Sequence, residues 1–146
     1  MGKFVFRLQA LLNVKVQIES SLKNELGKAI QELERQKGLL KHIEQEKEEY
    51  SEGISKKSSQ GVCVAELREY NSYLFFLRDR IKLKKEDIKA AQINVDIHRE
   101  KLIKVVQERK MLEKLKEKKY ELFLSEQNKE DQKRIDELVS FNYNTT

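Results

Sequence analysis

The chain has 146 residues, of which 38% are charged, with no proline, no tryptophan and a single cysteine. Ordinary globular domains have about a quarter of their residues charged, so this composition disfavours a compact core and favours long exposed helices. Thirty basic and 25 acidic residues leave a net charge of +5. Because the two signs are interspersed, they favour a solvated helix surface over the basic face of a nucleic-acid-binding protein. The single cysteine excludes an internal disulfide framework and suits a reducing compartment.

The first residues show no cleavage site for a signal peptide, and no stretch of the chain is long and apolar enough to span a membrane. Gly2 lacks the Ser or Thr four residues later that a myristoylation signal requires, because Phe6 stands there. We therefore expect a cytoplasmic protein.

A first helix is predicted over residues 4–51, because apolar residues recur there at alternating steps of three and four. This spacing is typical of a left-handed coiled coil. One additional step of four between Ile18 and Leu26 predicts a stutter, which locally unwinds the supercoil. The predicted stripe is Leu11, Val14, Ile18, Leu22, Leu26, Ala29, Leu33, Gln36, Leu40, Ile43, Lys47 and Tyr50.

A chain reversal is predicted over residues 52–64. Residues 51–61 form the only stretch rich in Gly and Ser, which favours a turn between two antiparallel helices. Cys63 and Glu66 have the spacing of a capping box, although sulfur is a poor acceptor and the cap should be weak. We expect the second helix to begin at residue 65.

The second helix is predicted over residues 65–139, followed by a short tail at 140–146. Its stripe is too narrow for burial inside a globule, so it requires a partner helix. The helix should be about 110 Å long against about 75 Å for the first, and should extend beyond it. The stripe is Leu67, Tyr70, Leu74, Leu77, Ile81, Lys84, Ile88, Ala91, Val95, His98, Leu102, Val105, Arg109 and Leu112.

The predicted fold is therefore all-α: a single domain, residues 1–146, forming a long antiparallel two-helix coiled-coil hairpin whose second helix is the longer. In the alternative, both helices run straight through the turn and pair between two chains. Beyond Leu112 the stripe becomes half polar, so this end is either frayed or reserved for another protein.

Catalytic chemistry is not indicated. His98 lies in the stripe, where a histidine satisfied by a facing side chain is the favoured interpretation. His42 and Glu46 share a helix face but lack further metal ligands. With no phosphate-binding loop and no nucleophile beside a base, we predict no enzyme, no metal and no cofactor.

Four blocks of sequence, spread over nearly the whole chain, carry a resemblance to a known family. They are Phe4-Val5-Phe6-Arg7-Leu8-Gln9-Ala10-Leu11-Leu12, Glu66-Leu67-Arg68-Glu69-Tyr70-Asn71-Ser72-Tyr73-Leu74, Glu108-Arg109-Lys110-Met111-Leu112-Glu113-Lys114-Leu115-Lys116-Glu117-Lys118-Lys119 and Ile135-Asp136-Glu137-Leu138-Val139-Ser140-Phe141. In this order they resemble the bacterial flagellar FliJ family. The one departure is Cys63, where relatives often carry a hydroxyl residue.

The resemblance implies a non-enzymatic component of the flagellar type III export apparatus, at the cytoplasmic face of the membrane at the flagellar base. It implies a stalk that binds the export ATPase hexamer, contacts the cytoplasmic domain of the export gate and escorts export chaperones. Nucleic acid and stable membrane insertion are not implied. The gate side would include Ile43, Tyr50, Tyr70, Tyr73 and Leu77, and the ATPase side Phe4, Phe6, Arg7, Asp136 and Glu137.

The stripe itself offers a structural role for Tyr50, Tyr70 and Leu77, whereas Tyr73 lies one step off it and should be partly exposed. Two other functions stay open on the residues alone. One is a generic coiled-coil scaffold or holdase chaperone. The other is a basic rod that binds RNA or a membrane surface, whose binding to phosphate groups should be lost as salt rises.

Overall fold

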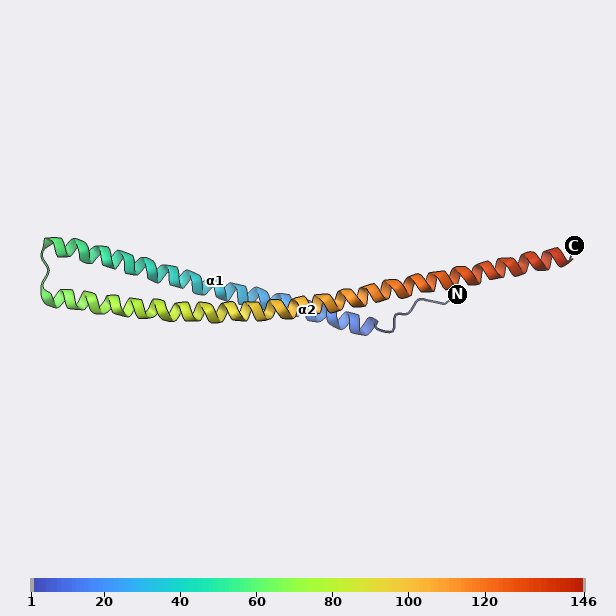
Figure 1. Ribbon diagram of the computed structural model, residues 1–146, viewed down its shortest axis with the longest axis horizontal. Coiled ribbons are helices and arrows are strands. Elements are labelled where there is room, and N and C mark those ends of the chain that lie inside the picture. Colours follow the sequence, from blue (N-terminus) through green and yellow to red (C-terminus); the bar gives the residue numbers. More distant parts are fainter. Residues whose placement is uncertain (1, 146) are drawn as a thin grey trace. The chain divides into compact units, whose positions relative to one another are not determined.

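The computed structural model describes residues 2–145, which form two helices and no strand. Helix α1 runs over Gln9–Gln60 and helix α2 over Val64–Thr145, with three residues between them (Figure 1). Contacts divide the chain into two units. We call residues 21–102 the hairpin unit, and residues 1–20 together with 103–146 the terminal unit. None of the described helices is both long and apolar enough to cross a membrane.

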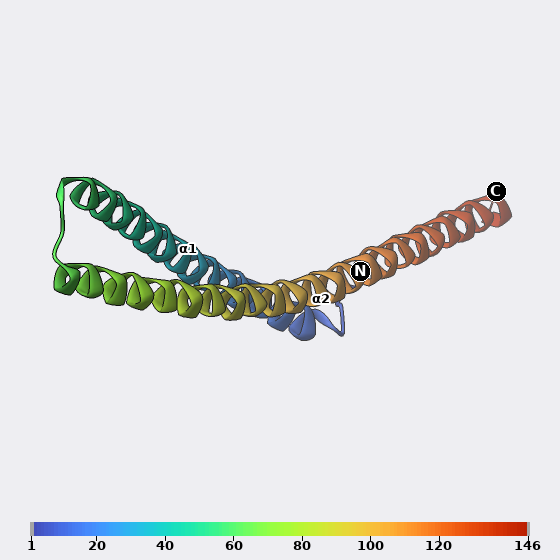
Figure 2. The same ribbon diagram turned by 60° about the vertical axis from the view of Figure 1, so that its left-hand side comes forward.

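In the hairpin unit the two helices pack antiparallel and lie side by side in both views (Figures 1 and 2). The ring of Tyr50 contacts that of Tyr70, and Gln36 is hydrogen-bonded to Lys84. The earlier residue of α1 thus pairs with the later residue of α2, as it must when two helices run in opposite directions. A core of Ala29, Leu33 and Val95 is buried between the helices, with Leu26, Ile88 and Ala91 packed against it. These contacts confirm the predicted antiparallel hairpin and its longer second helix.

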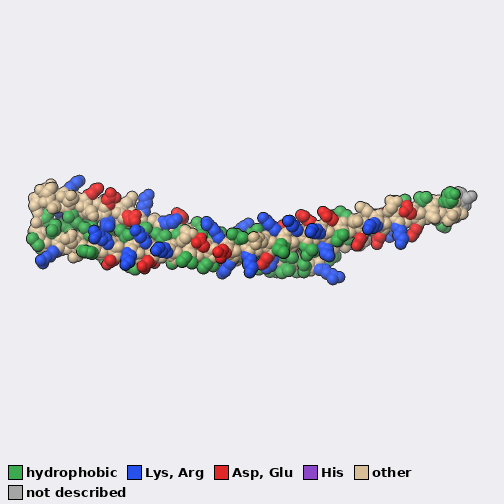
Figure 3. All heavy atoms as spheres, in the orientation of Figure 1, with side chains coloured by type: hydrophobic (Ala, Val, Ile, Leu, Met, Phe, Trp, Pro, Cys, Tyr) green, Lys and Arg blue, Asp and Glu red, His purple; other side chains and the backbone are tan. Residues whose placement is uncertain are grey.

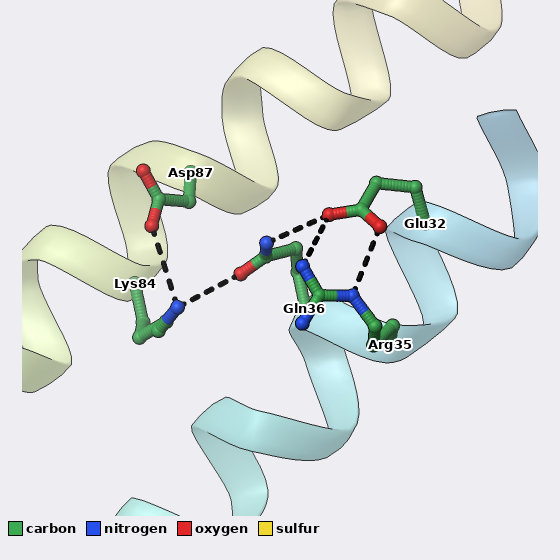
Figure 4. Close-up of polar contacts among 5 residues, drawn as sticks. All are labelled: Glu32, Arg35, Gln36, Lys84 and Asp87. Atoms are coloured by element: carbon green, nitrogen blue, oxygen red, sulfur yellow. Dashed lines mark hydrogen bonds and ion pairs between the residues drawn. The ribbon is translucent and has the colours of Figure 1, made fainter.

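The three polar residues in the stripe of α2 each face a polar residue of α1. Lys84 Nζ donates a hydrogen bond of 3.1 Å to Gln36 Oε1 and lies 3.6 Å from Asp87 (Figure 4). His98 lies with Nε2 3.6 Å from a Glu25 carboxylate oxygen and Nδ1 2.7 Å from the Asn94 carbonyl. The histidine therefore contacts a carbonyl of its own helix and, at the longer distance, the facing Glu25 carboxylate that the prediction of a facing side chain requires.

In the terminal unit, the third of these residues, Arg109, donates from Nε to the buried carboxylate of Glu19 and from Nη1 to Glu113 at 2.8 Å. Polar pairs at seam positions fit well in only one alignment of two helices, because any slide leaves a buried polar group without a partner. The pairs therefore specify the register within each unit.

A side-chain network on α1 orients one of these partners. The Glu32 carboxylate accepts hydrogen bonds from Arg35, at 2.9 and 2.7 Å, and from Gln36 Nε2 at 2.9 Å (Figure 4). Gln36 is thereby turned with its oxygen toward Lys84. The bonds from Arg35, then those from Gln36, stabilise the ionised carboxylate and lower the pKa of Glu32 to about 2.

The stripe of α1 is as predicted in the hairpin unit but differs in the terminal unit. There Leu12 and Glu19 are buried and Lys15 is half-buried, while the predicted Leu11, Val14 and Ile18 are 43%, 47% and 38% exposed. The steps of three and four therefore continue without a stutter, and that prediction was wrong. Charge pairing explains the choice, because Lys15 lies 2.5 Å from Glu108 and Glu19 pairs with Arg109.

The first helix begins at Gln9, not at residue 4. The Leu8 carbonyl accepts the Leu12 amide at 2.9 Å, which opens the helix, and residues 2–6 are not helical. Phe6 is buried, and the ring centroid of Phe4 lies 5.2 Å from that of Tyr120. The segment thus packs its aromatic side chains against α2. A helix that continued back to residue 4 would place these side chains at a different spacing.

The first helix also ends nine residues later than predicted, so the turn is residues 61–63 and not 52–64. A single Gly53 costs only about 1 kcal/mol inside a helix, and the neighbouring Ser and Lys residues tolerate helical backbone. Helix α1 ends instead where Gly61 adopts φ +89°, the left-handed conformation that commonly stops a helix.

The second helix begins at Val64, one residue before the predicted start. The Cys63 carbonyl accepts the Leu67 amide at 3.1 Å, so Cys63 occupies the predicted capping position. The helix continues through the predicted tail to Thr145, because residues 128–145 contain no Gly or Pro to end it. That the whole chain folds as one domain stays a prediction.

Candidate partner-binding surfaces

Four aromatic rings gather near the loop end of the hairpin unit, and we call Tyr50, Tyr70, Tyr73 and Phe76 the tyrosine cluster. The Tyr50 ring centroid lies 5.0 Å from that of Tyr70 and 4.6 Å from that of Tyr73, and Tyr73 lies 6.0 Å from Phe76. Helix α1 supplies one ring and α2 the other three. Figure 3 shows hydrophobic side chains gathered at this end of the pair of helices.

Tyr73 links the two helices, because its hydroxyl donates a hydrogen bond to Glu46 Oε1 of α1. This bond, together with partial burial, raises the pKa of Tyr73. Its ring is half-buried, in agreement with the predicted position beside the seam. Lys57 Nζ lies 5.2 Å from the Tyr70 ring centroid, and interaction with the Tyr70 hydroxyl raises the pKa of Lys57.

Two other residues predicted for the gate side lie inside the seam. Ile43 is 3% exposed and Leu77 is fully buried. The structure therefore brings the three tyrosines together in one surface and places Ile43 and Leu77 within the seam. A direct contact of these two side chains with a partner stays a prediction, and packing is the role that their burial supports.

Sequence reasoning missed two exposed phenylalanines next to these tyrosines. Phe75 is 63% exposed and Phe76 is 53% exposed. The guanidinium of Arg78 lies 5.6 Å from the Phe75 centroid, and that of Arg80 lies 5.8 Å from Phe76. The sequence did indicate their exposure. In the apolar run of residues 74–77 only Leu74 and Leu77 fit the stripe, so the two phenylalanines between them had to face outward.

A second surface lies in the terminal unit, where residues 3–8 run beside α2. The two segments enclose a groove of about 750 Å³, which we call the N-terminal groove. Phe4 contacts Tyr120 and Phe123 at centroid distances of 5.2 and 5.6 Å. Other apolar residues of the lining include Phe6, Leu115 and Leu122, and its charged residues are Lys3, Arg7, Lys119 and Glu126.

The residues predicted for the ATPase side fall into two groups. Phe4, Phe6 and Arg7 line the N-terminal groove. Asp136 and Glu137 lie further along α2, exposed and outside the groove lining, and Asp136 accepts a hydrogen bond of 3.2 Å from Gln132.

Both surfaces are lined by aromatic and aliphatic side chains with cations beside them. Side chains of these types are the ones that commonly contact other proteins. Among the described residues, no group of three His, Cys, Asp or Glu side chains could hold a metal ion.

Comparison with known proteins identifies the family. The family model described as Flagellar FliJ protein matches residues 4–146. No curated protein and no solved structure matches the chain. The match covers the hairpin unit and nearly all of the terminal unit, including both aromatic surfaces. The chain therefore belongs to the flagellar FliJ family, whose members are non-catalytic components of the flagellar export apparatus.

Proposed function

We propose that the protein is the coiled-coil stalk that links the export ATPase hexamer to the cytoplasmic domain of the export gate and escorts export chaperones. It acts in the cytoplasm, at the membrane face of the flagellar base, and requires neither nucleic acid nor stable membrane insertion. Family membership supports the setting. The observation that carries the linking role is one aromatic surface in each unit, because a linker needs two surfaces that engage different partners.

The tyrosine cluster and Phe75 form the gate side in this proposal. Rings on two packed helices offer a large contact area at small entropic cost, because few torsions remain to be fixed on binding. The neighbouring arginines add hydrogen-bond donors for acceptors on the partner. Ile43 and Leu77 contribute by holding the helices, and hence the rings, in place.

The N-terminal groove forms the ATPase side, with Phe4, Phe6 and Arg7 as its contact residues. Its volume is large enough to accept several side chains of a partner. Asp136 and Glu137 would add a second, charged contact on the same helix.

The test measures ATPase turnover and gate binding with the same set of variants. The purified chain should raise the turnover of the export ATPase and bind the cytoplasmic domain of the gate. Phe76→Ala should weaken gate binding by about 1–2 kcal/mol, the usual range for an interface anchor, and leave ATPase stimulation intact. Phe4→Ala should weaken the stimulation of the ATPase and leave gate binding intact, because Phe4 lines the N-terminal groove.

The matched control is Leu83→Ala on α2, a residue that is 60% exposed and lies outside both surfaces. It should change neither activity. An ATPase whose turnover does not respond to the chain would refute the linking role. If Phe76→Ala and Phe4→Ala impaired both activities equally, the assignment of separate surfaces would be wrong.

A further inference from the structure

A hollow of about 320 Å³ lies beside the tyrosine cluster, and we call it the tip pocket. Helix α1 lines it with Tyr50 and Lys57, and α2 lines it with Glu66, Glu69 and Tyr70. Glu66 lies three positions before Glu69 and four before Tyr70, so these three side chains share one side of α2. Two aromatic rings and two carboxylates therefore border the same space. The volume is at the lower end of the range for ligand pockets and suits a single long side chain.

Lys57, a cation of the chain itself, lies in this pocket. Its Nζ is 5.2 Å from the centroid of the Tyr70 ring. This is within the distance of about 6 Å at which the face of an aromatic ring attracts an ammonium group. The Tyr70 hydroxyl, and after it the Glu66 carboxylate, raises the pKa of Lys57. The tip pocket therefore stabilises a positive charge.

The carboxylates of the tip pocket carry more charge than Lys57 neutralises. Two carboxylates and one ammonium group leave the lining with one excess negative charge. Glu66 and Glu69 are both exposed, and among the residues that the structure describes neither forms a salt bridge. Lys57 is exposed as well, so its flexible side chain can leave the pocket without uncovering a buried surface.

We propose that the tip pocket binds a lysine or arginine side chain of the export gate, which displaces Lys57. The incoming cation lies over the Tyr70 ring, with the carboxylates of Glu66 and Glu69 beside it. Because Tyr50 and Tyr70 belong to both the pocket and the tyrosine cluster, a partner that covers the rings also reaches the pocket. The identity of the partner rests on the proposed function, whereas the positive charge of the bound side chain follows from the pocket itself.

The first test needs no flagellar partner. Its probes are the acetylated and amidated tripeptide Gly-Arg-Gly and the same peptide with neutral citrulline in place of arginine. In NMR titrations of the full chain into the millimolar range, the arginine peptide should shift the Tyr50 and Tyr70 ring signals saturably, and the citrulline peptide should not. Gly-Lys-Gly, titrated in the same way, shows whether the pocket prefers arginine or lysine.

Two variants should change the affinity for the arginine peptide in opposite directions. Glu66→Gln with Glu69→Gln should raise the dissociation constant about tenfold, because two exposed ion pairs are lost. Lys57→Gln should lower it about threefold or more, because the competing cation is removed from the pocket.

The second test measures binding of the same variants to the cytoplasmic domain of the gate. The substitutions at Glu66 and Glu69 should weaken gate binding about tenfold, and Lys57→Gln should strengthen it about threefold. The sign of the Lys57 result is decisive, because a lysine that itself contacted the gate would weaken binding when it is replaced.

The matched controls are Lys56→Gln, and Glu49→Gln with Glu52→Gln, which make the same charge changes at exposed positions outside the pocket lining. They should leave the binding of peptide and gate unchanged, and circular dichroism of each variant establishes that the helices are intact. A chain that binds the arginine peptide but not the gate would refute the proposed gate side and support the pocket. Equal binding of the arginine and citrulline peptides, or weaker binding by Lys57→Gln, would overturn the pocket.

Discussion

Leu77→Ala should destabilise the hairpin strongly, because the leucine is fully buried in the seam. The register of the neighbouring pairs places it opposite Ile43, which is 3% exposed. The substitution removes three carbon atoms from an apolar environment, and at about 0.8 kcal/mol per buried methylene this costs roughly 2.4 kcal/mol. A cavity between only two helices can partly collapse, so the loss should lie near the lower end of the range of about 2–5 kcal/mol.

Urea unfolding followed by circular dichroism at 222 nm measures this loss. For a chain of this size, about 2.5 kcal/mol corresponds to a fall in Tm of roughly 7–10 °C. Leu83→Ala is the matched control, because it is the same substitution on the same helix at a side chain that is 60% exposed. It should stay within about 0.5 kcal/mol of the unsubstituted chain. Equal losses for the two variants would refute the assignment of the seam.

Four further substitutions or titrations follow from the local geometry. NMR titration should give Glu32 a pKa of about 2, and Arg35→Gln should move this pKa toward 4.5. Because the pKa is lower in the folded chain, the Glu32 carboxylate stabilises the fold above about pH 4.5, and this contribution disappears as the pH falls toward 2. Gly61→Ala should cost roughly 1–2 kcal/mol in urea unfolding, because alanine is strained at φ +89° even though its Cβ meets no atom. Cys63→Ser should stabilise the chain by about 0.5–1 kcal/mol by supplying an oxygen cap, and an unchanged Tm would show that the cap contributes nothing. Tyr73→Phe should lower the Tm by removing the hydrogen bond to Glu46 but keep gate binding, because the ring contacts remain.

The packing of the hairpin unit could be predicted because each helix there has only one apolar stripe to bury against the other. From Leu22 to Tyr50 in α1, and from Tyr70 to Leu112 in α2, the stripe that periodicity selected is the one that packs. In the terminal unit two stripes compete, one residue apart. Periodicity selected Leu11, Val14 and Ile18 because they are apolar. Lys15 and Glu19 pack instead because their partners, Glu108 and Arg109, lie about ninety residues away.

The helix ends were harder to predict, because local composition determines them only weakly. The Gly- and Ser-rich stretch stays helical to Gln60, and a single backbone conformation at Gly61 ends it. The residues of the tyrosine cluster were accessible from the sequence, since Tyr50 and Tyr70 belong to facing stripes. The N-terminal groove was not, because it exists only where residues 3–8 leave the helix and lie against α2.

The polar seam pairs have a mechanical consequence. To slide along its partner by one repeat of seven residues, a helix would move about 10 Å. In the hairpin unit Lys84 would leave Gln36, and in the terminal unit Arg109 would leave Glu19. These two hydrogen bonds join half-buried and buried groups, so water would not replace either bond at once. A force that pulls lengthwise on one helix is therefore borne by its partner as well.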